Sequence, residues 1–437
     1  MCGILGRISI SRRQYNKNDF DIFNEALDLQ IHRGPDGRGI FESDKFIFGH
    51  RRLSVIDLDS HSDQPMISKC GNYILVFNGE IYNYLELKKD LLNKGYVFST
   101  SSDTEVLLNS FIEYGISCIN SFIGMFSFSI FDKHKDEFFI VRDRLGVKPL
   151  YYTKNNQEII FSSEIKSILK IDNSYVKLNK QAISSYMSFR YPITNNTFFQ
   201  NINSLPPAHY LKISKSFKVK TVEYWNLSNS FMEQKNDHGE EYYLKKLKIL
   251  LESSVRYRMI SDVPLGAFLS GGVDSSIITC IMSNNNTKPI KTFSVGFEEK
   301  GYNEFEYASL IASKFKTDHR ELTITGADYI NTMDELISYK DAPLSVPNEV
   351  PLYLMCKELK KDITVVLSGE GADEIFGGYG RIFRSSDDYE KIKNLDNYNI
   401  SDEEKIDFCK SILKKYRITK FETELDHFIN IYSYTSY

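Results

Sequence analysis

The sequence lacks the features that mark a membrane-spanning, zinc-binding or disulfide-stapled protein. It has six cysteines, widely scattered and without a C-x-x-C pair, which suits a reducing compartment and speaks against a structural zinc site. No run approaches the roughly 20 apolar residues of a membrane span. The apolar N-terminus precedes Arg12 and Arg13, which is the wrong order for a secretory signal. We therefore expect a cytoplasmic protein that does not bind a membrane.

Neither sign of charge is in marked excess. The 54 basic and 58 acidic residues leave a net charge of −4, so nothing favours nucleic acid as a partner. The composition is 42% hydrophobic and 26% charged, close to the globular average. A chain of 437 residues is long enough for two large domains.

Short β-like runs dominate residues 1–225. They are rich in aromatic and β-branched residues and are bounded by Gly, Asn or Asp. We expect strands at Lys45–Gly49, Tyr73–Phe77, Met125–Phe131, Glu137–Val141 and Glu158–Ser162. We expect helices at Asp19–Gln30, Tyr84–Lys94 and Asp103–Tyr114. Many strands with a few helices predict a layered sheet domain.

The pattern changes after a polar stretch, residues 226–240, which we expect to be a linker. Apolar residues at helical spacing then predict an amphipathic helix that ends near Arg258. Strands at Pro264–Ser270, Ile290–Phe297 and Ile363–Leu367 alternate with helices at Ser275–Ser283 and Glu304–Phe315. Such alternation predicts that residues 241–437 form a Rossmann-like α/β domain, a parallel sheet with helices on both faces.

Cys2 is the first candidate catalytic residue. The initiator Met is normally removed ahead of a small residue, which would make Cys2 the N-terminus. A free α-amine has a pKa of about 7.7–8.0 and can accept a proton from a thiol near neutral pH. One residue would then supply both nucleophile and base, as N-terminal Thr does. The alternative is that a Cys follows Met by chance.

Seven strings in residues 1–225 resemble the class II glutamine amidotransferase domain, an N-terminal-nucleophile hydrolase. They are Met1–Ile4, Ile31–Gly37, Gly49–Leu58, Phe77–Tyr84, Ser102–Val106, Arg142–Tyr152 and Phe161–Lys166. Their number and order make the resemblance specific. It implies a four-layer α/β/β/α sandwich.

The resemblance also implies a role for each residue of a glutamine site. Asn78 and Gly79 would stabilise the oxyanion that forms when Cys2 attacks the glutamine amide, each donor being worth about 3 kcal/mol. The glutamine α-carboxylate would bind Arg52, its α-ammonium group would bind Glu80 and Asp103, and backbone groups would come from Leu53, Ser54, Val55 and Ile56. Two alternatives are simpler: Asn78-Gly79 as a turn, and Asp103 as a helix N-cap. We assign no role to His32 or His61.

A Gly-Ser loop follows an apolar strand in the second half and opens a helix. Backbone N–H groups at such a helix N-terminus face an anion, although a capped Gly-Ser turn is an alternative. The loop resembles the pyrophosphate-binding loop of the N-type ATP pyrophosphatases. That resemblance implies ATP contacts from Leu269, Ser270, Gly271, Gly272, Asp274, Ser275, Ser276 and Val295, with Asp274 also a Mg²⁺ ligand.

A second string, Val366–Tyr379, resembles the matching loop of glutamine-dependent asparagine synthetases. The resemblance implies ATP contacts from Ser368 and Gly369, a catalytic role for Glu370 in forming or using the acyl-adenylate, and Mg²⁺ binding by Asp373. It also puts Glu374 near the amino-acid substrate. A solvated acidic helix start is the alternative.

Together the two halves resemble a glutamine-hydrolysing asparagine synthetase from Met1 to about Gly380. The resemblance implies that ATP and Mg²⁺ activate aspartate as β-aspartyl-AMP, which ammonia released from glutamine then attacks after crossing an intramolecular tunnel. It also implies a homodimer. The family's A-R-V-P-F-L-D and K-x-x-L-R strings are not found after Gly380. The sequence therefore predicts either a C-terminally truncated product or divergent residues in that role.

Two alternative functions stay open at this point. One is amidation of another carboxylate, such as a sugar uronate. The other is a truncated protein that keeps only glutaminase or binding activity.

Overall fold

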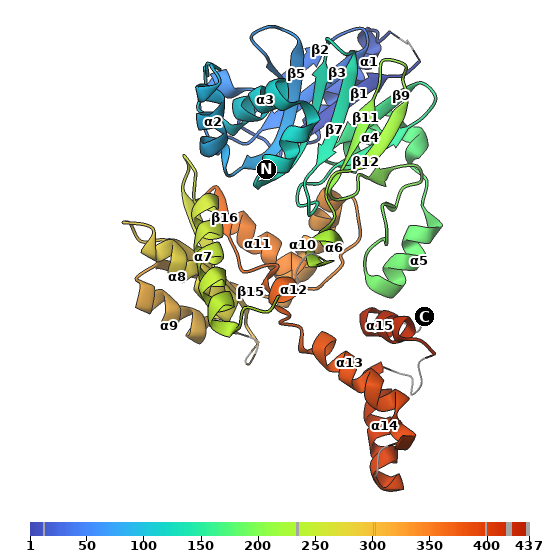
Figure 1. Cartoon of the computed structure of the whole chain (residues 1–437), viewed down its shortest axis with the longest axis vertical. Helices are drawn as coiled ribbons and strands as arrows, with labels where there is room; N and C mark the ends of the chain where they lie inside the picture. The colour runs from blue at the N-terminus through green and yellow to red at the C-terminus, as the bar shows by residue number, and fades with distance from the viewer. Residues whose placement is uncertain are drawn as a thin grey trace.

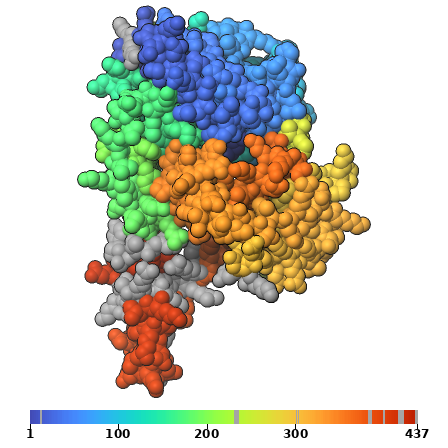
Figure 2. Space-filling model, turned by 180° about the vertical axis from the view of Figure 1, so that it is seen from behind, coloured from blue at the N-terminus to red at the C-terminus, as the bar shows by residue number. Residues whose placement is uncertain are grey.

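Two α/β bodies and a helical tail make up the chain (Figure 1). The computed structural model describes residues 1–11, 14–232, 236–299, 301, 303–397, 400–416 and 422–433. The first body ends with a strand at residues 219–223, and the second begins with a helix at residues 240–258. The two bodies pack directly against one another (Figure 2).

Two antiparallel six-stranded sheets lie at the centre of the first body. The first sheet has the order β10 (Asn203–Ser204), β8 (Tyr151–Lys154), β9 (Glu158–Ser162), β1 (Gly3–Ser9), β3 (Phe46–Arg52) and β2 (Gly37–Glu42). The second has the order β12 (Val219–Glu223), β11 (His209–Ile213), β7 (Glu137–Arg142), β6 (Gly124–Asp132), β5 (Tyr73–Ile81) and β4 (Met66–Ile67).

Alternation along each strand sends side chains to opposite faces of these sheets. In β1, Ile4 and Ile8 join a core between the two sheets, whereas Leu5 packs under α1 (Lys17–Asp28) on the outer face. In β5, Ile74 and Val76 face the same inter-sheet core, whereas Leu75 and Phe77 face outwards. Each sheet therefore needs apolar cover on both sides.

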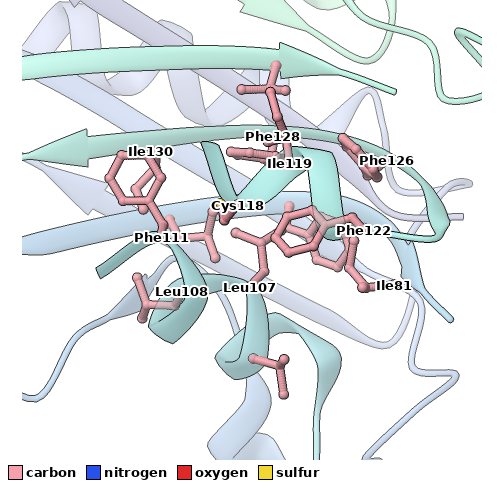
Figure 3. Packing of buried hydrophobic residues seen from close by; sticks show 14 of the residues in the cluster. Ile81, Leu107, Leu108, Phe111, Cys118, Ile119, Phe122, Phe126, Phe128 and Ile130 are labelled. Carbon is pink, nitrogen blue, oxygen red and sulfur yellow. The ribbon is translucent and has the colours of Figure 1, made fainter. Parts of the chain in front are cut away.

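Helices supply the outer cover on each sheet. The first sheet is covered by α1 and α4 (Ile165–Ile171), and the second by α2 (Tyr84–Asn93) and α3 (Asp103–Tyr114). Figure 3 shows how Leu107, Leu108 and Phe111 of α3 meet side chains from β5 and β6. The result is the four-layer α/β/β/α sandwich that the resemblance implies.

Two further helices lie outside the four layers of the sandwich. One is α5 (Lys180–Phe189), whose N-cap Asn179 accepts hydrogen bonds from the N–H groups of Gln181 and Ala182. The other, α6 (Leu227–Met232), lies inside the predicted linker. Residues 233–235 of that linker lie outside the described residues.

The second body has a parallel four-stranded sheet, again as predicted. Its order is β15 (Asp318–Ile324), β14 (Lys291–Phe297), β13 (Leu265–Phe268) and β16 (Val365–Leu367). Its helices are α7 (Glu240–Arg258), α8 (Val273–Asn284), α9 (Phe305–Phe315), α10 (Gly326–Lys340) and α11 (Glu349–Leu359). Ala267 of β13 packs with α7 and α8, whereas Phe268 packs towards α11, so helices cover both faces.

Short helices follow the last strand and lead into the tail. They are α12 (Ala372–Phe376), α13 (Gly380–Lys393), α14 (Asp402–Tyr416) and α15 (Glu424–Tyr432). The helices α13 and α14 extend away from both bodies (Figure 1). Ile412 and Ile431 form a small core there with Ile392 and Phe408. Among the described residues, no helix is long and apolar enough to cross a membrane.

Candidate functional site

Strand alternation brings the predicted glutamine-site residues to one end of the space between the two sheets. Cys2 continues the inter-sheet row of Ile4 and Ile8, and Gly3 pairs with Arg51, so Cys2 lies level with Arg52 of β3. On the facing strand β5, Asn78 and Glu80 continue the row of Ile74 and Val76. Three strands from two sheets thus meet at this edge.

The Cys2 thiol contacts both backbone polar groups of one residue, Leu53. The Leu53 N–H donates to Cys2 Sγ at 3.4 Å, and Sγ lies 3.7 Å from the Leu53 carbonyl oxygen, to which it donates. On the other side, Arg33 Nε donates to the Cys2 carbonyl oxygen at 3.0 Å. Neither contact requires a free α-amine, so the thiol is already positioned while Met1 is attached.

The chain terminus lies among charged groups. Burial lowers the pKa of the Met1 amine to about 5; Lys148 and Arg33 add to this effect, while Cys2 and Glu80 oppose it. The Met1 amine is therefore neutral near pH 7 and has a lone pair that can accept a proton. After removal of Met1, the amine in this region would belong to Cys2.

Asn78 has the properties of an oxyanion donor. Its side chain is fully buried, yet neither amide atom has a hydrogen-bond partner among the described residues. Leaving a buried amide unpaired costs about 1–3 kcal/mol, so its retention here points to a ligand. The alternative that Asn78-Gly79 forms a turn is wrong, because both residues pair with β6 inside the ladder, opposite Ser127 and Phe126.

Gly79 is required by close packing between β5 and β6. A Cβ at this position would lie 2.3 Å from the Met125 carbonyl oxygen and 2.7 Å from the Phe126 Cα. The missing side chain lets the neighbouring strand approach, so any residue other than Gly would displace the backbone beside Asn78.

Arg52 is nearly buried and is held by the loop that follows it. Its Nη1 donates to the Asp59 carbonyl and to Asp63 Oδ1, each at 2.8 Å, and its Nη2 donates to the Asp57 carbonyl. These bonds use three of the five guanidinium hydrogens. The Nε–H and one Nη2 hydrogen lie on the same edge of the fork and suit a carboxylate.

The loop backbone itself is largely engaged by other groups. The Ser54 N–H donates to Asp36 Oδ2 at 2.9 Å, and the Val55 carbonyl accepts from Asp262 of the second body at 2.9 Å. Ile56 packs into the core beneath α3. Of the four predicted backbone contacts, only Leu53 faces the thiol.

Two carboxylates lie close together beside this loop. Burial and the charge of Asp103 raise the pKa of Glu80 well above its usual value. Burial raises the pKa of Asp103 to about 6, although the Ile81 N–H donates to its Oδ2 at 2.9 Å. Such a pair favours a cationic ligand. The alternative that Asp103 is the N-cap of α3 is wrong, since Ser102 caps the helix through the Glu105 N–H.

Sequence reasoning missed Lys148 as a site residue. It is 2% exposed, and its ammonium group makes no hydrogen bond or ion pair with a described residue. Burial lowers its pKa, while the nearby Glu80 and Cys2 raise it. Lys148 lies in the string Arg142–Tyr152, but nothing in the sequence singles it out there, and its burial depends on the fold.

A polar network connects this site to the second body. Glu164 accepts from His32 at 2.7 Å, from Arg33 at 3.3 Å and from Lys166 at 2.8 Å. The Lys166 N–H donates to Asp341 Oδ2 of the second body at 3.0 Å. Next to this network, a cavity of about 490 Å³ lies between the bodies and reaches from Arg33 and Ser163 to the α10–α11 region. His61, in contrast, is exposed, and among the described residues its ring bonds only Asp59.

The first candidate nucleotide loop connects β13 to α8. Ser270 and Ser275 hold it together: their hydroxyl groups lie 3.0 Å apart, and Ser270 Oγ accepts from the Gly272 N–H at 3.2 Å. Gly271 has φ +84°, and a Cβ there would lie 2.5 Å from the Tyr307 Cβ, so only Gly fits. Gly272 caps the helix without a side chain, which leaves the first N–H groups of α8 open to an anion.

The second predicted loop meets the first one. A Cβ on Gly369 would lie 2.9 Å from the Ser275 nitrogen and 3.0 Å from the Asp274 Cβ. Beyond this contact, Glu374 accepts from Tyr379 OH at 2.7 Å, and Glu370 is exposed. Both loops lie at the carboxyl ends of parallel strands, the place where open α/β sheets bind ligands.

Two predicted ATP contacts are already engaged in the core. Leu269 is fully buried against α9, its N–H donates to the Phe293 carbonyl at 2.9 Å, and its carbonyl accepts from Ser294. Val295 packs towards α11. Among the described residues, no group of three or more Asp, Glu, His or Cys could hold a metal, so a cation between Asp274 and Asp373 would need further ligands from a bound nucleotide.

Comparison with known proteins gives the class of each half. Residues 1–225 match the glutamine amidotransferase domain model, and residues 246–420 match the asparagine synthase model. A solved structure titled as glutamine phosphoribosylpyrophosphate amidotransferase from B. subtilis aligns with a TM-score of 0.40 and 14% identity, over 84% of this chain and 91% of that one.

Three relatives identify the family to which the chain is similar. Glutamine-hydrolysing asparagine synthetases 1 and 3 of Bacillus subtilis are 36% and 33% identical; each alignment covers 87% of this chain, and 59% and 63% of the relative. A putative asparagine synthetase 2 of Methanocaldococcus jannaschii is 36% identical, over 87% of this chain and 76% of the relative. The chain belongs to the family of glutamine-hydrolysing asparagine synthetases. It spans about 60% of the length of the two Bacillus relatives.

Proposed function

We propose that this chain transfers the amide nitrogen of glutamine to the β-carboxylate of aspartate at the expense of ATP. The observation that carries the proposal is the presence of two sites in one chain. In one, the Leu53 backbone holds the Cys2 thiol opposite the strand that carries Asn78. In the other, two loops meet at the N-terminus of a helix. The first arrangement fits acyl transfer from an amide, and the second fits binding of a nucleotide phosphate.

In the first body, the Cys2 α-amine takes the thiol proton once Met1 has been removed. The thiolate attacks the glutamine side-chain carbonyl, and Asn78 and the Gly79 N–H donate to the oxyanion. Collapse breaks the C–N bond, and the protonated amine of Cys2 returns its proton to the leaving nitrogen, which departs as ammonia. Water then hydrolyses the thioester to glutamate. Arg52, Glu80 and Asp103 bind the α-carboxylate and α-ammonium groups of glutamine.

In the second body, the aspartate β-carboxylate attacks the α-phosphorus of ATP, which releases pyrophosphate and gives β-aspartyl-AMP. Ammonia attacks the acyl carbon, and asparagine and AMP leave. The N–H groups at the start of α8, with Ser270 and Ser275, bind phosphate oxygens. Asp274 and Asp373 would hold Mg²⁺, which would supply positive charge to stabilise the leaving pyrophosphate. Glu370, on the second loop, acts in forming or using the acyl-adenylate.

The cavity between the bodies supports an internal route for ammonia. It begins at Arg33, which contacts Cys2, and it is lined on the other side by Tyr339, Tyr353 and Cys356. A neutral molecule such as ammonia passes a partly apolar lining more easily than ammonium does. A homodimer and a cytoplasmic location are further expectations from the family.

The experiment that tests the proposal is Cys2→Ala. Glutamine-dependent asparagine formation should fall at least a thousandfold, whereas ammonia-dependent formation should stay within twofold. Asparagine and pyrophosphate are measured with each nitrogen donor. Cys70→Ala, at an exposed cysteine outside the site, is the matched control and should change neither rate. Glutamine-dependent synthesis that survives Cys2→Ala would disprove the nucleophile assignment.

The acceptor is tested separately by ATP–pyrophosphate exchange with the unmodified chain. Aspartate should support exchange, and sugar uronates should not. Exchange with a uronate alone would replace aspartate in the proposal, and the absence of exchange with either acid would restrict the function to glutamine hydrolysis.

A further inference from the structure

The segment that leads into the first nucleotide loop is docked on the first body. Tyr257, in the last turn of α7, donates from its hydroxyl group to Glu86 Oε1 at 2.9 Å. The Arg258 guanidinium lies 4.8 Å from the centre of the Tyr82 ring, and Ile260 packs against the core beneath α3. The chain therefore enters β13 directly from a contact with the glutaminase half.

Asp262 makes two hydrogen bonds from this segment to residues of the first body. Its own N–H donates to the Val55 carbonyl at 2.9 Å, and its Oδ2 accepts from the Asp57 N–H at 2.7 Å. Both partners belong to residues 53–59, the loop that brackets the Cys2 thiol at one end and holds Arg52 at the other. We call these residues the glutamine loop.

Asp57 has an unusual backbone conformation within the glutamine loop. Its φ is +56°, a left-handed conformation that non-Gly residues seldom adopt. Its N–H is held by Asp262, its carbonyl accepts from Arg52 Nη2, and its carboxylate accepts from the Ser101 N–H at 2.7 Å. The same residue that Asp262 holds therefore orients the guanidinium of Arg52.

The other side of the segment is anchored at the start of the two strands that lead to the nucleotide loops. Ser261 forms a local turn with Val263, and the Pro264 carbonyl accepts from the Thr364 N–H at 3.0 Å. Pro264 leads into β13 and the first loop, and Thr364 leads into β16 and the second loop. Asp262 thus lies between the glutamine loop and the common base of the two strands.

We propose that Asp262, although it belongs to the nucleotide-binding body, is a positioning residue for glutamine in the first body. The proposal rests on the proposed function, because it uses the role given there to Arg52. Without the Asp262 carboxylate, the Asp57 N–H loses its acceptor and the glutamine loop loses a constraint on Arg52. Binding of glutamine weakens, whereas the chemical step at Cys2 and Asn78 is unchanged.

The test compares three variants in glutamine hydrolysis. Asp262→Ala should raise the KM for glutamine about three- to tenfold with kcat within twofold, as expected for the loss of one hydrogen bond. Asp262→Asn keeps an acceptor oxygen and should restore a KM near that of the unmodified chain. Tyr257→Phe removes a different hydrogen bond between the bodies, far from the glutamine loop, and should leave KM unchanged.

Several results would overturn the proposal. An unchanged KM in Asp262→Ala would show that the contact does not matter. An Asn variant as weak as the Ala variant would show that an acceptor does not suffice. An equal rise in Tyr257→Phe would show that any loosening of the interface has this effect.

A second measurement does not need catalysis. Amide hydrogen exchange of peptides covering residues 53–59 should be faster in Asp262→Ala than in Tyr257→Phe. If the unmodified chain hydrolyses no glutamine, the proposed function fails. The exchange comparison then still decides whether Asp262 holds the loop, and equal exchange in both variants would overturn that claim.

Discussion

The two candidate sites of this chain are built in opposite ways. Arg52, Asn78 and Asp103 of the glutamine site are all under 10% exposed and come from facing sheets and a capped helix. Most of the nucleotide site is loop, and Ser270, Gly272 and Glu370 are exposed. The first site has its charges in place and desolvated before substrate arrives. The second presents backbone N–H groups and hydrated carboxylates that a nucleotide must bring together.

This difference has a consequence for the chemistry. A buried donor such as Asn78 needs no reorganisation during the reaction, which is the condition under which electrostatic stabilisation is most effective. We expect the nucleotide loops instead to gain order from the charge of a bound nucleotide and from a cation. Single changes should therefore have larger effects in the first site, and each prediction below tests that expectation.

The largest effect is expected for Asn78→Ala. Loss of one preorganised oxyanion donor should lower kcat for glutamine hydrolysis about 10²–10³-fold and leave KM nearly unchanged. Since the amide has no partner in the described structure, the thermal midpoint should change by only a few degrees. Both quantities are measured on the same protein preparation.

The matched control is Ser129→Ala. The Ser129 hydroxyl is also buried and without a partner among the described residues, and it lies on the neighbouring strand β6 away from Cys2. Its removal should alter neither rate nor stability. If kcat of Asn78→Ala fell by less than tenfold, the burial of this amide would serve packing and not the reaction.

Much of this first site follows from the sequence alone. Motif strings locate Cys2, Asn78 and Asp103, and the period of two in β-strands explains why Cys2 and Asn78 lie in one layer. The sequence prediction ended β5 at Phe77, four residues short of Ile81, because Asn and Gly are typical of turns. Pairing with β6 overrides that preference.

Contacts between distant segments could not be predicted in the same way. The hydrogen bond between Asp57 and Asp262 joins residues 205 positions apart, and neither residue stands out locally. Lys148 is notable only once the fold has buried it. The strand β15 and the helices α10 and α11 were missed, since Asp318–Ile324 is largely polar and its β-structure depends on pairing with β14.

The next largest effect is a rise in the KM for glutamine at acidic pH. Burial raises the pKa of Asp103 to about 6, so below that pH the carboxyl group takes up a proton and no longer attracts the α-ammonium group. The KM for glutamine should therefore rise up to about tenfold per unit as pH falls from 6 to 5. Steady-state glutamine hydrolysis across this range gives the profile.

Asp103→Asn sharpens this expectation. The Asp103 charge is one cause of the raised pKa of Glu80, so its removal should weaken glutamine binding at pH 7 and move the remaining rise in KM to lower pH. A flat profile for glutamine in the unmodified chain would contradict the role given to the pair.

The smallest effects are expected for Gly→Ala changes, which compare the rigidity of the two sites. In Gly79→Ala the new Cβ meets the backbone of β6 at 2.3 Å, which the sheet cannot relieve, so the free energy of unfolding should fall by about 1–3 kcal/mol. In Gly369→Ala the new Cβ meets Ser275 N at 2.9 Å, but we expect the two loops to relieve this contact by moving apart. Stability should change by less than about 1 kcal/mol, while the KM for ATP rises several-fold. Gly326→Ala, with no atom within 4 Å of the added Cβ, is the control.

If Gly369→Ala destabilised the chain as much as Gly79→Ala, the nucleotide loops would be as rigid as the glutamine site. The contrast between a prebuilt site and one completed by its ligand would then be wrong.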